Sequence, residues 1–333
     1  MDRRSKKRFS ALYDMENSQM KNEKIMAMPP KYFFGVAAVC ILGILIGSFF
    51  DLSISEHLAN KTELGAFFAT YGSILSYALY PAAGMCIFKG LLKKGEKFRM
   101  LAWTIFILSF FLAVYYSNEY NGAKVRELFG YEPGVSAPAV SLLTILFWLP
   151  IYLLVPLLFS KTIDEADSNK LIATGCIILI AGLGSDLFIN LLKQFGSRPR
   201  YKYLLTLPEP AAEFRNWWQF RPNLAGSNDN FKSWPSLNMT IATMMFSLPL
   251  LADVTKNRSK KRNIGCFAFA CLYVAAYGYN RIHMTNHFLS DVCFGVLITL
   301  VIFMVVSKAF IRAAENNRSV SKPRAAKRSP RSR

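Results

Sequence analysis

The 333-residue sequence contains only six cysteines and three histidines, and it has far fewer acidic residues than basic ones. The cysteines all fall inside apolar runs, where they are expected to act as small core residues, so neither a disulfide framework nor a metal site is predicted. No internal repeat and no motif for a cofactor stands out. The cysteines are Cys40, Cys86, Cys176, Cys266, Cys271 and Cys293.

Long apolar runs dominate what is present. Hydrophobic residues make up 53% of the chain, and the run from Tyr32 to Phe50 contains no charged residue. A helix of that length spans roughly 30 Å, the thickness of a bilayer core. No small-residue cleavage site follows this first run, which indicates a retained span rather than a signal peptide. The sequence predicts an all-α integral membrane protein with about eight transmembrane helices, near 32–50, 68–88, 100–116, 139–160, 171–192, 236–253, 264–280 and 288–311.

Basic residues are distributed unevenly between the connecting segments. If both termini are cytoplasmic, the cytoplasmic segments hold 29 of the 40 lysines and arginines and the outer segments hold 11. This is the positive-inside bias of multi-pass membrane proteins. Seven of the 11 outer basic residues lie in the loop 193–235, where topology does not explain them.

Three regions follow from these patterns. Residues 1–31 are expected to form a basic cytoplasmic tail, residues 32–311 the transmembrane domain, and residues 312–333 a second basic tail that is disordered. Both tails are predicted to contact anionic lipid headgroups. No aromatic residues interleave their basic residues, which argues against nucleic-acid binding.

An arginine, a histidine and an aspartate precede the last apolar run. His287 and Asp291 are one helical turn apart, so the carboxylate is expected to accept a hydrogen bond from one ring nitrogen and leave the other free. Arg281 could hold an anionic group of a substrate. This arrangement is typical of an oriented nucleophile or base.

Two further clusters lie in the outer loop. Lys193, Arg198 and Arg200 follow the fifth predicted span. Lys193 alone could simply reach the headgroups and complement a helix dipole, but the arginines are unfavourable on the outer side. Ser236 follows Pro235 at the start of the sixth span, where unpaired backbone N–H groups would form a phosphate site, although a helix cap alone explains this pattern.

Together the clusters resemble the type 2 phosphatidic acid phosphatase superfamily, whose relatives include the vanadium haloperoxidases. The resemblance covers roughly residues 171–305. Lys193 and Arg200 match its first motif, with Tyr201 where proline is usual. Arg281, His287 and Asp291 match its third motif, with Asn280 in place of serine.

The resemblance implies a six-helix phosphatase core with its site on the extracytoplasmic face of a membrane, expected to be the plasma membrane. A lipid phosphate would reach the site from the side. His287 would attack phosphorus to form a phosphohistidine, and Asp291 would orient its ring. The phosphate would be bound by Lys193, Arg200, Arg281 and the amides around Ser236.

The second motif departs from the family pattern. Leu237 stands where glycine is usual, and Asn238 replaces the histidine that protonates the leaving group. An amide cannot deliver a proton, so activity is expected to be impaired and to favour pyrophosphorylated lipids such as polyprenyl pyrophosphates, whose leaving group needs no acid. His283 is a candidate substitute acid. A catalytically silent relative that binds or transports a lipid phosphate stays an alternative.

Two other features have structural explanations. His57 is expected in a solvated outer loop together with Asp51, Glu56 and Glu63. Trp217 and Trp218 fit an aromatic anchor at the membrane interface, which could also line the path of a lipid.

Overall fold

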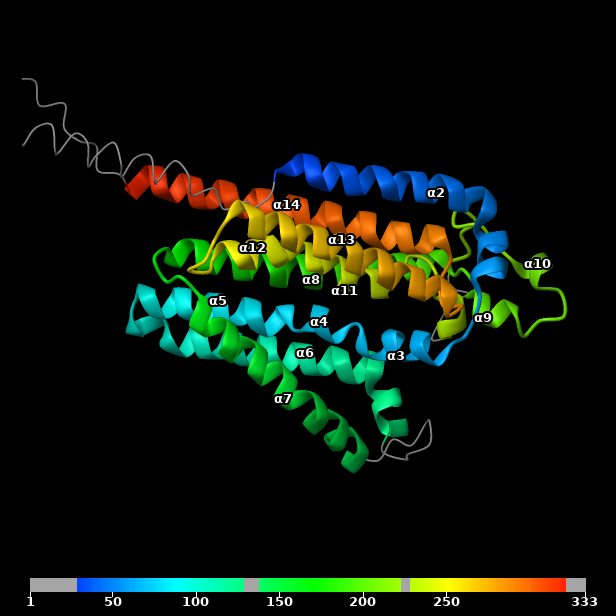
Figure 1. Cartoon of the computed structure of the whole chain (residues 1–333), viewed down its shortest axis with the longest axis horizontal. Coiled ribbons are helices and arrows are strands. Elements are labelled where there is room, and N and C mark those ends of the chain that lie inside the picture. Colours follow the sequence, from blue (N-terminus) through cyan, green and yellow to red (C-terminus); the bar gives the residue numbers. More distant parts are fainter. Residues whose placement is uncertain (1–28, 129–137, 223–227, 322–333) are drawn as a thin grey trace, which may run out of the picture.

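The computed structural model describes residues 29–128, 138–222 and 228–321, and these ranges are almost entirely helical (Figure 1). Within them, the β-structure is limited to an isolated bridge between Ile163 and Thr255. The α-helices are α2 (Pro30–Leu58), α3 (Glu63–Tyr71), α4 (Ile74–Tyr77), α5 (Leu79–Lys94), α6 (Arg99–Leu128), α7 (Pro138–Thr162), α8 (Ser168–Gly196), α9 (Tyr201–Leu204), α10 (Pro210–Glu213), α11 (Leu237–Thr243), α12 (Leu248–Asp253), α13 (Lys260–His283) and α14 (Leu289–Ser321). Three 3₁₀-helices, η1 (Glu96–Phe98), η2 (Asp229–Phe231) and η3 (Met244–Ser247), complete the described elements.

All eight predicted spans are helical, and the chain is a multi-pass membrane protein. Among the described residues, six helical segments are long and apolar enough to cross a bilayer. The segment 237–253 is shorter, and α13 is outside this set because it begins with three basic residues and carries several polar side chains. The six segments are Pro30–Leu58, Glu63–Lys94, Glu96–Asn118, Ile145–Thr162, Ser168–Leu204 and Leu289–Ala313.

Two of the eight segments are interrupted helices. The segment 237–253 changes from α11 through η3 to α12, where Pro249 has no N–H to donate to the preceding turn. The segment 63–94 is divided into α3, α4 and α5 near Gly72. Side chains of α13 satisfy carbonyls that this break exposes: the Tyr273 hydroxyl donates to Gly72 and the Arg281 guanidinium to Ala69.

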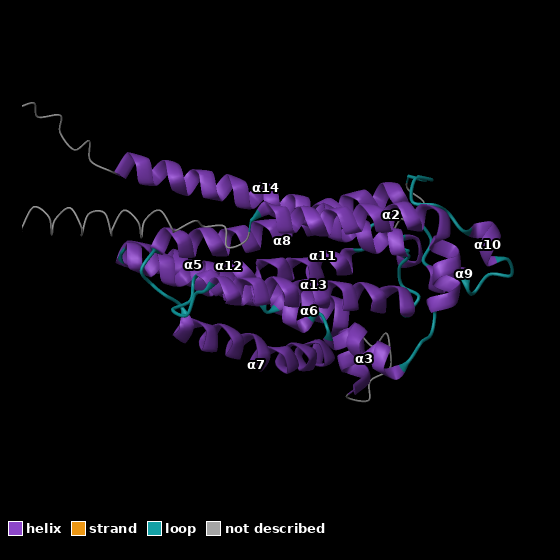
Figure 2. Ribbon diagram, turned by 45° about the horizontal axis from the view of Figure 1, so that its top comes forward, coloured by secondary structure: helices purple, strands orange, loops and turns teal. Residues whose placement is uncertain are grey.

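The helices form a bundle in which several helices pack against α8. α5, α11 and α14 pack against α8, α2 packs against α14, and α6 and α7 form an outer layer on α5 (Figures 1 and 2). The connecting segment that contains α9 and α10 covers one end of the bundle (Figure 1). The helix ends that carry the predicted motifs all meet beneath this cover.

Glycines allow α2 to approach α14 closely. A Cβ at Gly43 would lie 2.5 Å from Cys293 Sγ, and one at Gly47 would lie 2.9 Å from the Ser290 nitrogen. Small residues four apart on one helix face let two membrane helices pack backbone against backbone. One turn further, the same face carries Asp51, which is therefore pressed against the start of α14.

Three predictions about where segments begin and end have different outcomes in the structure. α2 continues to Leu58, so Asp51 is buried in a helix and the prediction that it lies in a solvated loop was wrong. α14 continues to Ser321, so residues 312–321 are helical rather than disordered, because neither proline nor glycine interrupts them. The rest of the two basic tails, residues 1–28 and 322–333, lies outside the described residues.

Candidate active site

His287 lies in the short loop between α13 and α14 and is almost fully buried, with 1% of its surface exposed. Its Nδ1 is 2.8 Å from the backbone carbonyl oxygen of Ser233. A carbonyl oxygen can only accept, so Nδ1 of the neutral ring carries the proton and Nε2 keeps its lone pair. Nε2 is buried and has no hydrogen-bond partner among the described residues.

The expected contact between Asp291 and His287 is not formed. Oδ2 of Asp291 is 3.9 Å from His287 Nδ1, which is beyond hydrogen-bond distance. Asp291 instead accepts hydrogen bonds from the Ser233 hydroxyl at 2.6 Å and from the Phe288 N–H at 3.0 Å. It therefore fixes the residue whose carbonyl holds the ring, and its influence on His287 is indirect.

Three of the predicted phosphate ligands surround His287. Burial lowers the pKa of His287 well below its ordinary value of 6.5, and the positive charges of Arg200, Lys193 and Arg281 lower it further. The hydrogen bond to Ser233 opposes this effect. The sequence prediction that these cations converge on one site is consistent with this arrangement.

Each of the three cations donates a hydrogen bond to a protein oxygen. Lys193 Nζ donates to the carbonyl of Lys232 at 2.5 Å. The Arg200 guanidinium contacts Asp229 through its carbonyl and its carboxylate. Arg281 lies 4.6 Å from the centre of the Tyr277 ring, and its buried Nε has no partner among the described residues. The site thus gathers positive charge that the nearby carboxylates only partly balance.

The second motif contributes less than expected. The N–H of Ser236 donates to the Asp291 carbonyl at 3.0 Å, so it is already paired, contrary to the prediction that it points outward. Leu237 is buried and Asn238 is half-buried at the start of α11. The described structure pairs the Asn238 side chain with no other group.

The two other histidines do not reach His287. His283 donates from Nδ1 to the Leu58 carbonyl, and its ring stacks on Tyr279, so its contacts are with the end of α2 and with α13 itself. His57 is exposed as predicted, but it lies in the last turn of α2 rather than in a loop. Trp217 packs on Phe294 of α14 and donates to Ser48 of α2, so the outer loop is attached to the membrane helices.

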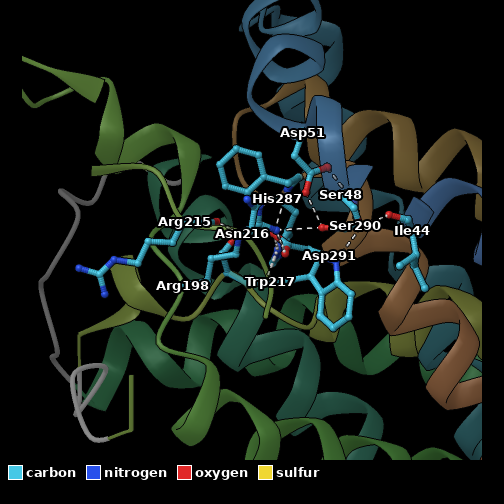
Figure 3. A network of polar contacts seen from close by, with 12 residues as sticks. Ile44, Ser48, Asp51, Arg198, Arg215, Asn216, Trp217, His287, Ser290 and Asp291 are labelled. Atoms are coloured by element: carbon cyan, nitrogen blue, oxygen red, sulfur yellow. Dashed lines mark hydrogen bonds and ion pairs between the residues drawn. The ribbon is translucent and has the colours of Figure 1, made fainter. Parts of the chain in front are cut away.

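Sequence reasoning missed two charged residues at the centre of the site. Arg198 is inserted between Asp51 of α2 and Asp291 of α14, and all three are buried (Figure 3). A charged residue directly after an apolar run was the available signal for Asp51, because charges beside a membrane span are costly unless they are paired. The backbone carbonyl of Ser233 carried no signal in the sequence.

Comparison with known proteins assigns this region to a family. The model of the PAP2 superfamily matches residues 172–314, which include every residue of the candidate site except those of α2. Searches of curated proteins and of solved structures found no significant match. The superfamily is a helical membrane fold whose members generally hydrolyse phosphate esters. Residues 172–314, which are 143 of the 333 residues, therefore match the PAP2 superfamily.

Proposed function

We propose that this protein hydrolyses lipid phosphates or pyrophosphates through a phosphohistidine on Nε2 of His287. The main support for this proposal is the state of the His287 ring. Its proton is fixed on Nδ1 by the Ser233 carbonyl, and its free, buried Nε2 lies among three cations. A neutral imidazole with one available lone pair is a competent nucleophile.

In the first step, the Nε2 lone pair attacks phosphorus and the bond from phosphorus to the leaving oxygen breaks. Lys193, Arg200 and Arg281 stabilise the charge that builds on the other phosphate oxygens. In the second step, water attacks phosphorus, the bond between phosphorus and Nε2 breaks and its electron pair returns to Nε2, and inorganic phosphate leaves with the protons of the water. No metal is needed for either step.

The leaving group decides which substrate is favoured. Phosphatidic acid must release an alkoxide, which needs a proton that Asn238 cannot supply. A lipid pyrophosphate attacked at its terminal phosphorus releases a lipid monophosphate, whose last pKa is about 6 and which leaves without an acid. We therefore assign pyrophosphorylated lipids as the preferred substrates.

An apolar groove supports a lipid substrate. It has a volume of about 560 Å³ and is lined by apolar side chains of α2, α11, α13 and α14. Its lining includes Ile282 and Leu289, which flank the His287 loop, and extends to Phe246 and Val36 deeper in the bundle. A hydrocarbon chain in this groove would leave its phosphate near the cations.

The experiment compares phosphate release from phosphatidic acid and from a polyprenyl pyrophosphate by purified protein. Wild type is expected to turn over the pyrophosphate faster, and rapid quenching with labelled substrate should trap label on His287. His287→Ala should abolish both signals, whereas His57→Ala, which changes an exposed histidine, should keep them. Faster hydrolysis of phosphatidic acid would contradict the proposed substrate preference.

A silent relative that binds or transports a lipid phosphate is the second candidate, and Asn238 at the position of the acid favours it. In that case wild type binds the pyrophosphate without releasing phosphate and forms no phosphohistidine. Activity that appears only in Asn238→His would decide for this candidate.

A further inference from the structure

Arg198 occupies a closed environment next to His287. Its side chain is 2% exposed and lies 4.2 Å from the centre of the Phe288 ring and 5.3 Å from that of Phe214. Nε donates to the Arg215 carbonyl at 2.7 Å, while the Arg215 side chain itself points away from the cluster (Figure 3). A substrate phosphate cannot reach a guanidinium enclosed in this way.

The two ends of the Arg198 guanidinium bind different helices. Nη1 donates to Asp291 Oδ1 at 2.6 Å and to Ser290 Oγ at 2.9 Å, both on α14. Nη2 donates to Asp51 Oδ2 at 2.9 Å, on α2. Asp51 also accepts from the N–H and the hydroxyl of Ser290. Both carboxylates are fully buried, and Arg198 is the cation that contacts them directly.

A continuous path leads from this cluster to the nucleophile. Arg198 fixes one oxygen of Asp291, and the other oxygen accepts from the Ser233 hydroxyl. The carbonyl of the same Ser233 holds His287 Nδ1. Displacing Asp291 would therefore displace the group that orients the ring, and small displacements at a reacting atom cost large factors in rate.

We propose that Arg198 and Asp51 are positioning residues: they clamp Asp291, and through Ser233 they hold the His287 ring in its reactive orientation. This inference rests on the function proposed above. It distinguishes the two arginines of the outer segment, because Arg200 contacts the exposed Asp229 beside His287 whereas Arg198 is committed to the protein interior. It also makes α2, which lies outside the matched family region, part of the site.

The test measures kcat and KM for a polyprenyl pyrophosphate in Arg198→Lys, Arg198→Gln, Asp51→Asn and the matched control Arg221→Gln. Arg221 is an exposed arginine of the same outer loop. Lysine keeps the charge of Arg198 but cannot span two carboxylates, so kcat should fall about 10- to 100-fold with KM changed less than threefold. Asp51→Asn should lower kcat about tenfold, also with little change in KM.

Ligand binding separates positioning from a general loss of structure. Misfolding would lower the number of binding sites in a sample, but it would leave the affinity of the folded molecules unchanged.

Inorganic vanadate is an analogue of the phosphoryl-transfer transition state, and its affinity can be measured without turnover. We expect Arg198→Lys and Asp51→Asn to bind it at least tenfold more weakly than wild type, and Arg221→Gln to bind it unchanged. If both variants keep kcat and vanadate affinity within threefold of the wild-type values, the proposal that Arg198 and Asp51 position His287 is wrong. A raised KM with unchanged kcat in Arg198→Lys would show that Arg198 binds the substrate, and this result would also overturn the proposal.

Failure of the proposed function gives a different result. If wild type releases no phosphate but binds vanadate, the vanadate affinities of the two variants still decide the clamp. If wild type neither releases phosphate nor binds vanadate, the phosphatase proposal is wrong and the clamp is overturned with it.

Discussion

A backbone carbonyl, rather than a carboxylate, sets the tautomer of His287. The Ser233 carbonyl accepts the Nδ1 proton, and Asp291 holds Ser233 through its hydroxyl. Because no substitution at position 233 removes the carbonyl, its side chain can be changed without removing the acceptor. We therefore expect Ser233→Ala to lower turnover through the freedom of the loop, while the nucleophile survives.

The buried, neutral state of His287 predicts how stability depends on pH. Its pKa is lowered well below 6.5 in the folded protein, whereas the unfolded chain takes up a proton near pH 6.5. The stability that the neutral His287 ring contributes to the folded protein is complete above pH 6.5. It is lost as the pH falls below 6.5, because the unfolded chain then takes up a proton that the folded protein does not. Between about pH 7.5 and 5.5, wild type should lose about 1 kcal/mol more than His287→Asn, measured by unfolding in detergent.

A matched histidine provides the control for this experiment. His57 is exposed, so His57→Asn should follow the pH dependence of wild type. An equal loss of stability in wild type and in His287→Asn would mean that the folded protein protonates His287 as readily as the unfolded chain does.

Asn238 predicts a selective gain of function. Asn238→His should raise hydrolysis of phosphatidic acid by roughly 100- to 10,000-fold, because the new imidazole protonates the alkoxide. Hydrolysis of a polyprenyl pyrophosphate should change less than tenfold, since its leaving phosphate needs no acid. The ratio of the two kcat/KM values is the measurement, and an unchanged ratio would show that the leaving group does not limit the rate.

At the scale of elements, α2 can lie close to α14 because glycines on one face of α2 carry no side chain. A methyl group at position 47 would lie 2.7 Å from Asp51 Oδ1 and 2.9 Å from the Ser290 nitrogen, whereas one at position 35 would meet nothing within 4 Å. Gly47→Ala should therefore cost about 1–3 kcal/mol through overpacking and should lower turnover. Gly35→Ala, on the same helix, should be neutral or stabilising by its helix propensity.

Melting temperature and kcat measured on the two alanine variants decide this point. Gly47→Ala should lower both quantities, and Gly35→Ala neither. If both variants behave like wild type, the close approach of α2 does not support the site.

For the whole molecule, we propose from the helix order and the distribution of the basic residues that both termini are cytoplasmic and that the site faces the outside of the cell. Glu213 lies beside the site in the outer cover, and Glu96 lies at the opposite end of the bundle between α5 and α6. A membrane-impermeant maleimide should label Glu213→Cys on intact cells and Glu96→Cys only after permeabilisation. The reverse pattern would put the site in the cytoplasm.

The sequence predicted the helices and the charged motifs well because both depend on short spacings. Apolar runs predicted the eight long helical segments but not the short helices α9 and α10. The fixed separations among Arg281, His287 and Asp291 drew attention to the loop that carries His287. The Asp51 and Arg198 pair was missed because their contact joins α2 to the segment after α8, which no local pattern records. The acceptor for His287 was misassigned because a spacing of four residues permits a contact with Asp291 but does not require it.

The contact between Asp51 and Ser290 has a consequence for the order of biosynthesis. The two residues are 239 positions apart, on the first and the last described long helices. Asp51 enters the membrane before Arg198 has been synthesised, and the start of α14 follows much later still. The cluster around His287 is therefore completed only after the last helix has left the ribosome, so chains that stop before α14 cannot form it.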